Sequence, residues 1–318
     1  MRSLSLLGAV GLALASSTSD TAAQTADRLN PMIALHEAGQ PVFGLYAPAN
    51  RGGRGGAPAG PQKTPLELAH ETVAFESSDY VFTGSMEGSV DRGLPDWAAY
   101  VGALQHAGAN ARTHPLVVKT PKISDDPAAA IDNISRQLNS GASGVMFVAV
   151  ESAQEVRQGL AAMRFRSNGG TRPDVVGDAP AYWGVSEAEY HRRADLWPLN
   201  PDGELVNWTI VESHEGLANV REIAAVEGIG VLWPGAGTLR GLFSTVGPDG
   251  ERVLDEEAWE AAIQKVLAAC KEFDVPCGYP ANASDIETRM EQGFSVFVMG
   301  WGEGGFETVD IGRRVSKR

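Results

Sequence analysis

The chain has 318 residues, 43% of them hydrophobic and 21% charged, and is long enough to bury a large core in one big domain or two smaller ones. Its net charge of −14 argues against nucleic acid or an anionic membrane surface as a partner, because both would repel it. The 37 glycines and 18 prolines follow no period, which excludes a collagen-like protein, and two cysteines are too few for a disulfide-rich scaffold.

The first residues have the features of a secretory signal peptide. Arg2 precedes an apolar run over residues 4–15, and small residues follow down to Thr21, Ala22 and Ala23, which suit a cleavage site. The run is well short of the roughly 20 residues that span a bilayer. We therefore expect residues 1–23 to be removed, and the mature protein to be periplasmic or secreted, with no membrane contact once processed.

Eight short apolar runs, rich in β-branched residues, alternate with stretches of helical period. They occupy residues 41–47, 80–85, 115–120, 144–150, 207–213, 228–235, 276–280 and 295–301. These runs are almost continuously apolar, as expected of parallel strands covered on both faces. The eightfold alternation predicts a single α/β domain over residues 24–318, a (β/α)8 TIM barrel. An open doubly wound sheet is the alternative, but no GxGxxG motif follows the first run.

Helix signals lie between these runs. Thr64 with Glu67, and Ser152 with Glu155, have the spacing of capping boxes. Asp126 followed by proline opens another helical pattern, and residues 255–273 carry apolar side chains at helical spacing behind an acidic first turn.

Two segments interrupt the alternation. Residues 49–63 form a Gly/Pro-rich loop after the first run. Its Arg51 and Arg54 could cover an anionic ligand, since loops that follow strands lie on the catalytic face of a barrel, but a segment of this composition is more often a mobile surface loop. Residues 166–206 form a longer insertion that contains Tyr182, Trp183, Tyr190 and Trp197. Because four aromatic side chains are costly to expose, we expect this insertion to pack as a lid or against a neighbouring subunit.

The two cysteines, Cys270 and Cys277, lie on either side of a short turn. An oxidising compartment would allow a disulfide across that turn. The interpretation we favour from the sequence is two buried thiols that behave as small hydrophobic residues.

Charged side chains follow several of the predicted strands, where the reactive groups of a barrel belong. Glu212 closes the fifth strand, and a carboxylate there is costly unless it holds a metal or meets a cation; the alternative is a cap for a helix starting near His214. Lys119 ends the third strand and has three possible roles: an ion pair with Glu87 or Glu212, binding of a carboxylate, or an amine nucleophile. An ion pair is the most common of these three roles. His214 is near enough to the barrel mouth to be considered for the site, but a lone histidine at such a position is more often a surface residue.

Several of these segments resemble the HpcH/HpaI aldolase and citrate lyase family. The resemblance runs over about residues 28–314 and is carried by the segments 43–46 (FGLY), 79–91, 115–119 (PLVVK), 144–153 (GVMFVAVESA), 211–216 (VESHEG) and 226–235 (VEGIGVLWPG). It implies a barrel of the phosphoenolpyruvate/pyruvate superfamily that makes or cleaves carbon–carbon bonds next to a pyruvate enolate. It also implies a divalent metal and a homo-oligomer, a hexamer or trimer.

The resemblance also implies roles for individual residues. Glu212 matches the family's metal-binding Glu, but the position of the second carboxylate falls on Gly237 or Thr238, so a Mg or Mn ion would be held weakly. Glu87 stands where the family has a catalytic His and, if buried, could act as the general base. Lys119 replaces the Arg that binds the substrate carboxylate and could stabilise an oxyanion. We expect further substrate contacts from Arg51, Gly235, Ala236, Gly237 and Thr238.

The sequence therefore predicts an aldolase-like carbon–carbon lyase that acts on a small hydroxy- or oxo-acid in an aromatic-lined, partly lidded site. Its catalytic residues would be Glu87 and Lys119, and its metal ligand Glu212. The alternative is a non-catalytic periplasmic ligand-binding protein that kept the barrel and lost its metal.

Overall fold

The computed structural model describes residues 28–50 and 61–318. The expected signal peptide, and Arg51 with most of the expected loop 49–63, lie outside the described residues. Within the part that is described, no helix is both long and apolar enough to cross a membrane.

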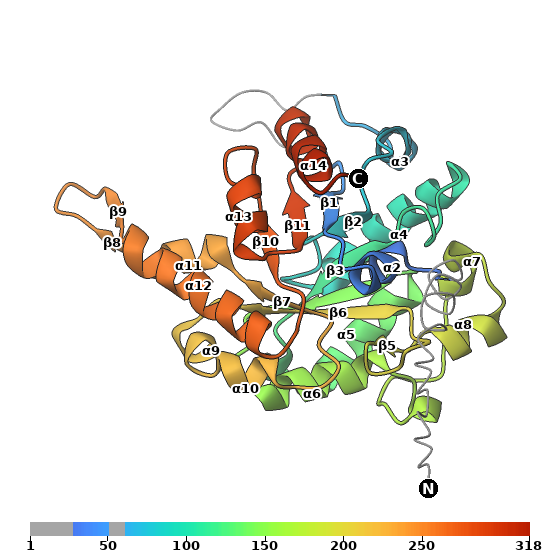
Figure 1. The fold of residues 1–318 in the computed structure, drawn as a ribbon. Helices are drawn as coiled ribbons and strands as arrows, with labels where there is room; N and C mark the ends of the chain where they lie inside the picture. Colours follow the sequence, from blue (N-terminus) through green and yellow to red (C-terminus); the bar gives the residue numbers. More distant parts are fainter. Residues whose placement is uncertain (1–27, 51–60) are drawn as a thin grey trace, which may run out of the picture.

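Parallel strands pair side by side in a ring (Figure 1). Its members are β1 (Val42–Tyr46), β2 (Tyr80–Thr83), β3 (Leu116–Thr120), β4 (Gly144–Phe147), β6 (Leu205–Val211), β7 (Val231–Pro234), β10 (Gly278–Pro280) and β11 (Val296–Met299). β1 pairs with both β2 and β11, and the pairing continues through β3, β4 and β6 to β7. A parallel bridge between Leu232 of β7 and Cys277, just before β10, closes the ring. The predicted TIM barrel and its eight predicted strands are confirmed.

The inside of the ring is filled by large aromatic side chains. Tyr80 packs edge-on against Trp208 with ring centres 5.1 Å apart, and Trp208 stacks on Trp233 at 5.4 Å. Two glycines make room for these rings. A Cβ atom at Gly44 would lie 2.2 Å from the Tyr80 ring, and one at Gly278 would lie 1.8 Å from the Trp233 ring. The barrel is therefore a packed core and not a pore.

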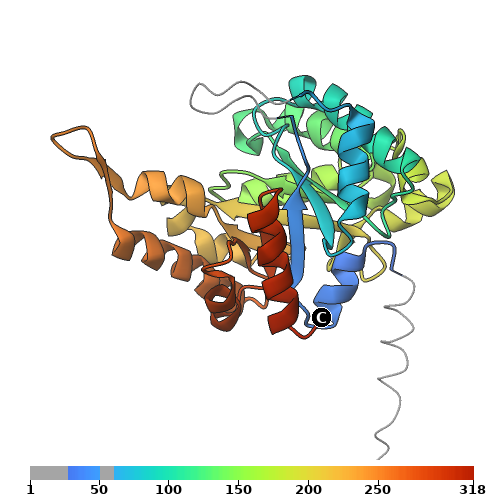
Figure 2. The same ribbon diagram turned by 90° about the horizontal axis from the view of Figure 1, so that it is seen from above.

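Helices cover the outside of the ring (Figure 2). The main ones are α3 (Pro65–Ala74), α4 (Val90–His106), α5 (Pro127–Asn139), α6 (Ala153–Met163), α9 (His214–Ala218), α10 (Val220–Ala224), α11 (Ala236–Leu242), α12 (Glu256–Glu272), α13 (Ile286–Gln292) and α14 (Glu303–Val315). Thr64 and Glu67 form the predicted capping box at the start of α3. At α6 only half of the predicted box forms: Ser152 accepts from the Glu155 N–H, but the Glu155 carboxylate accepts from N–H groups outside the box.

The insertion 166–206 lies at the amino end of the barrel, so the predicted lid is wrong. It folds into η2 (Arg166–Asn168), α7 (Ala179–Trp183), α8 (Glu187–Arg193) and β5 (Leu196–Trp197). Tyr182 donates a hydrogen bond to the carbonyl of His114, just before β3, and the Trp183 indole donates to the carbonyl of Gly141, just before β4, at 2.7 and 3.1 Å. The aromatic rings are buried against their own chain because their polar tips find backbone acceptors there.

The amino end is closed further by α2 (Pro31–Glu37). Met32 and Ile33 of this helix belong to the cluster of side chains that fills the barrel. His36 stacks on Trp197 of the insertion with ring centres 5.5 Å apart. Access to the barrel is therefore from the carboxyl ends of the strands.

A small antiparallel hairpin was not predicted. It consists of β8 (Ser244–Val246) and β9 (Arg252–Leu254), and it projects away from the barrel in both views (Figures 1 and 2). Its strands have only three residues each, and Val246 and Val253 are exposed, so no apolar run long enough to signal a strand is present.

Cys270 and Cys277 form a disulfide, where the sequence favoured two free thiols. Their Cα atoms are 5.7 Å apart, and both residues are buried. The bond ties the end of α12 to the residue that bridges to β7, where the ring closes.

A side chain at Gly278 should disrupt the packing inside the barrel. Gly278→Ala places a Cβ inside the Trp233 ring, so we expect the free energy of unfolding to fall by about 2 kcal/mol or more in a urea titration followed by tryptophan fluorescence. Gly102→Ala, in α4 with open space around its Cβ, is the control and should be neutral or slightly stabilising. Equal effects of the two substitutions would contradict this packing.

Candidate active site

A small cavity lies at the carboxyl ends of the strands, where barrel active sites are found. Its volume is about 200 Å³. Lys119 from β3 and Glu212, which follows β6, both line it, above a floor that includes Phe82, Ile210 and Trp233. The structure thus brings two of the predicted site residues, a cation and a carboxylate, to one apolar-floored space, which we call the inner cavity.

Glu212 is held in place by backbone on both sides. Its Oε1 accepts a hydrogen bond from the Ala149 N–H at 3.0 Å, and Ala149 has a φ of 48°, a left-handed conformation that is uncommon for alanine. On the other side Gly235 leaves room for the carboxylate, because a Cβ there would lie 2.5 Å from Oε2. Glu212 is not the helix cap that we considered as an alternative: Ser213 caps α9 and accepts from the Gly216 N–H.

Lys119 and Glu87 form an ion pair at the rim. The Lys119 Nζ lies 3.0 Å from the Glu87 Oε2, and the Lys119 carbonyl accepts a hydrogen bond from Gln137 of α5. The lysine side chain is 16% exposed, but that of Glu87 is 42% exposed and does not line the inner cavity. The expected ion pair is confirmed, whereas the expected burial of Glu87 is wrong because the turn after β2 places it on the open side of the lysine.

Tyr46 is a member of the site that the sequence analysis did not select. It ends β1, lines the inner cavity and packs edge-on against Phe82. Burial raises the pKa of its hydroxyl; the charge of Lys119 lowers it and that of Glu87 raises it, so the three groups are close enough to interact. Its position at the carboxyl end of β1 is the sequence feature that could have identified Tyr46 as a site residue.

Gly235 and the first turn of α11, which follow β7, border the inner cavity. Gly235, Ala236, Gly237 and Thr238 all line it, and the Gly235 N–H donates to the Val211 carbonyl. Their contact with substrate stays a prediction. His214 does not line the inner cavity and instead packs against the Phe243 ring, as expected for a residue outside the site. The predicted contact from Arg51 lies outside the described residues.

The donor set does not fit a resident divalent ion. Among the described residues, no three His, Cys, Asp or Glu side chains gather into a potential metal site. Glu212 is a single carboxylate, the first turn of α11 beside it has Gly237 and Thr238 in place of a second one, and the Lys119 ammonium borders the same space. Because Mg²⁺ takes about six oxygen ligands and is repelled by a cation, we derive no chemical step from a metal.

The fold and the site together define a class: a TIM-barrel protein with a small charged cavity at the carboxyl ends of its strands. The family model described as HpcH/HpaI aldolase/citrate lyase matches residues 98–300, from α4 to the end of β11. The chain belongs to this family.

Individual relatives are distant. The chain is 25% identical over 168 residues to the 2-dehydro-3,6-dideoxy-6-sulfogluconate aldolase of Pseudomonas putida, a match that covers 51% of this chain and 58% of that relative. An HpcH/HpaI aldolase from Desulfitobacterium hafniense DCB-2 superposes with a TM-score of 0.61 at 19% identity, over 85% of this chain and 90% of that one. The protein CitE of Mycobacterium tuberculosis, in complex with magnesium and pyruvate, superposes with a TM-score of 0.51 at 16% identity, over 87% and 90%. At such identities these structures establish the fold alone.

The donor set predicts weak binding of divalent ions. We expect Mn²⁺ to bind the protein only in the millimolar range, measured by electron paramagnetic resonance of the free ion. Thr238→Asp adds a carboxylate to the first turn of α11, which lines the inner cavity, and should tighten binding about tenfold or more. Thr245→Asp, on the remote hairpin strand β8, is the control. Micromolar Mn²⁺ binding by the unmodified protein would show that the donor set has been misjudged.

Proposed function

We propose that the protein is an aldolase-like carbon–carbon lyase that acts on a small hydroxy- or oxo-acid. The observation that carries the proposal is the shared inner cavity of Lys119 and Glu212. Membership of an aldolase and citrate lyase family, and the distant aldolase relative, support the reaction class.

The inner cavity suits a small 2-oxo acid. Its volume of about 200 Å³ has room for a short acid, and its cation can face a carboxylate or a carbonyl oxygen. The aldolase relative is named for a 2-dehydro sugar acid, and the CitE structure contains pyruvate, which supports an acid of this kind. The small-molecule acid is the proposed partner. The homo-oligomer that the resemblance implies stays a prediction.

The proposed reaction is the cleavage of a 4-hydroxy-2-oxo acid. A base takes the proton of the C4 hydroxyl, the C3–C4 bond breaks, and its electron pair moves to the C2 oxygen as an enolate. An aldehyde leaves, and the enolate takes up a proton at C3 to give pyruvate or a substituted pyruvate. The positive charge of Lys119 stabilises the enolate oxygen, which carries more charge than the carbonyl from which it forms.

The two carboxylates divide the remaining work. Glu87, beside the lysine at the rim, accepts the hydroxyl proton and returns it at C3. Glu212 is fixed by the Ala149 N–H and orients the substrate by repelling its carboxylate toward Lys119. Because the Glu212 side chain is already fixed, little conformational entropy is lost in ordering it when the substrate binds.

Loss of the Lys119 charge should remove most of the activity. We expect Lys119→Met to lower kcat/KM for pyruvate release from 4-hydroxy-2-oxo acids by about 100-fold or more, because the enolate loses its counter-charge. Lys122→Met is the matched control. Lys122 lies three residues on and pairs with Glu151 at 2.6 Å, away from the inner cavity. Equal activities of the two variants would exclude the proposed role of Lys119.

A non-catalytic binding protein is the second candidate. The single carboxylate of the inner cavity favours it, because the second metal-binding position of the family falls on Gly237 or Thr238. If the protein only binds its ligand, pyruvate binding should be saturable in the presence of a chelator, and no 4-hydroxy-2-oxo acid should be cleaved. Cleavage of any such acid would exclude this candidate.

We further propose that the protein is exported to the periplasm or secreted. The apolar run of residues 4–15 with the small residues up to Ala23 supports this, and so does the disulfide between Cys270 and Cys277, since such bonds persist in oxidising compartments.

Export predicts a defined mature protein. Intact mass analysis of the periplasmic fraction should give a chain that begins at Gln24, and thiol titration after unfolding without reductant should find no free cysteine. A full-length chain in the cytoplasm with two reactive thiols would refute export.

A further inference from the structure

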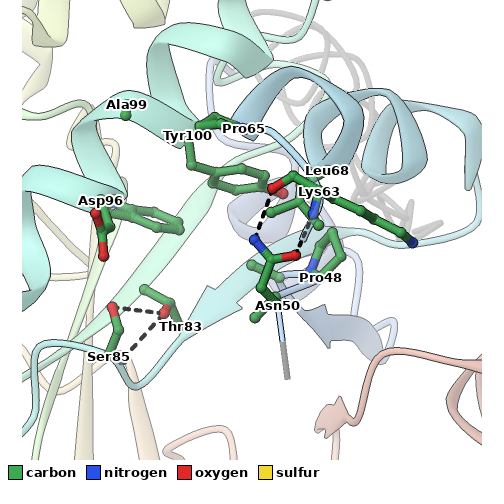
Figure 3. A pocket seen from close by; sticks show the side chains of 13 residues that line it. Pro48, Asn50, Lys63, Pro65, Leu68, Thr83, Ser85, Asp96, Ala99 and Tyr100 are labelled. Atoms are coloured by element: carbon green, nitrogen blue, oxygen red, sulfur yellow. Dashed lines mark hydrogen bonds between the residues drawn. The ribbon is translucent and has the colours of Figure 1, made fainter. Parts of the chain in front are cut away.

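A second pocket lies at the same rim, outside the barrel. It opens between the ends of β1 and β2 on one side and helices α3 and α4 on the other (Figure 3). Its volume is about 440 Å³, compared with about 200 Å³ for the inner cavity. Small-molecule sites commonly measure about 300–1,000 Å³, so this outer pocket has the size of one.

The outer pocket and the inner cavity meet at two strands. Tyr46 and Phe82 line the inner cavity, and the residues that follow them, Ala47 and Thr83, line the outer pocket. Side chains alternate between the faces of a strand, so these neighbours point to opposite sides of the barrel wall. Gly84 comes next, and a Cβ there would still be 3.6 Å from the Lys119 side chain. Gly84, which lies between Thr83 and Ser85 of the outer pocket, is thus a neighbour of the Lys119 side chain, and the two spaces adjoin at this point of the rim.

Aromatic side chains form the buried wall of the outer pocket. Trp97 and Tyr100 of α4 line it and are 4% and 6% exposed. The Trp97 indole N–H has no acceptor among the described residues, an uncommon state for a buried donor. The Tyr100 hydroxyl bonds to that of Thr72, and burial raises its pKa, so the group stays uncharged. This wall suits a flat apolar group with a polar substituent.

The polar groups of the outer pocket favour an uncharged ligand. Thr83 donates a hydrogen bond to the Ser85 oxygen at 3.2 Å, which leaves the Ser85 proton free to donate (Figure 3). Asp96 is exposed on α4 and has no ion pair within the described chain, whereas the Lys63 ammonium is paired with Glu71. Among the described lining residues the unpaired charge is thus negative and would repel an anion.

We propose that the outer pocket is the acceptor subsite of the lyase and takes an uncharged aryl or hydroxyaryl group of the aldehyde. The inference rests on the proposed function. In the synthetic direction, C3 of pyruvate loses a proton to Glu87 and its electron pair bonds to the aldehyde carbon at the rim, while the alkoxide formed from the aldehyde oxygen takes up that proton; cleavage reverses these changes. The ring lies on Trp97 and Tyr100, with its hydroxyl between Ser85 and Asp96. The acid half stays at Lys119.

Binding can be tested apart from turnover with 4-hydroxybenzyl alcohol, which has no carbonyl group to react. Saturation-transfer NMR should detect its binding to the unmodified protein. Ala99→Phe fills the outer pocket from α4 and should weaken binding about tenfold or more. Ala98→Phe is the matched control, since Ala98 is exposed on the same helix but does not line the pocket. Absence of binding, or equal binding by both variants, overturns the subsite.

Turnover distinguishes the subsite from the proposed function. With pyruvate as donor, the ratio of kcat/KM for 4-hydroxybenzaldehyde to that for acetaldehyde should fall about tenfold in Ala99→Phe and stay at the unmodified value in Ala98→Phe. An unchanged ratio in Ala99→Phe overturns the subsite while the lyase stands. Pocket-dependent binding of the alcohol without any aldol reaction refutes the proposed function and the acceptor role together, and leaves the outer pocket as a ligand site.

Discussion

The fit of large aromatic rings against glycine inside a closed parallel ring is the constraint on which the rest of the structure depends. The rings of Tyr80, Trp208 and Trp233 fill the barrel only because Gly44 and Gly278 have no side chains. Closed in this way, the strands end at a common rim, and Trp233 becomes part of the floor under Lys119 and Glu212. Packing thus fixes both where the charged groups meet and how little space they share.

The barrel could be predicted because its strands are buried on both faces and appear in the sequence as uninterrupted apolar runs. Which end an insertion covers has no such signal. The aromatic residues of 166–206 indicated burial, but only the structure, with hydrogen bonds from Tyr182 and Trp183 to the His114 and Gly141 carbonyls, shows that they cover the amino end. The sequence favours free thiols over the disulfide for a similar reason, since Cys270 and Cys277 are brought together by how α12 packs beside the closing strand.

The sequence predicts which residues belong to the candidate site better than it predicts how those residues are arranged. Lys119, Glu87 and Glu212 could be identified because each lies at or just after the carboxyl end of a predicted strand. An ion pair was the expected role of the lysine, and it forms with Glu87. How far the turn after β2 exposes Glu87 depends on backbone geometry that residue types do not encode. Tyr46 escaped selection because a tyrosine that ends an apolar strand looks like core, although its hydroxyl end is close enough to interact with Lys119 and Glu87.

Under the proposed function, a lysine ammonium takes the place of a metal ion as the group that stabilises an enolate. Enolate formation can be observed without knowing the natural aldehyde, by following hydrogen–deuterium exchange at the pyruvate methyl group in D₂O by NMR with a chelator present. The account predicts exchange well above the uncatalysed rate, lost when Lys119 is replaced by methionine. Exchange no faster than in buffer, or exchange that appears only when a divalent ion is added, would contradict it.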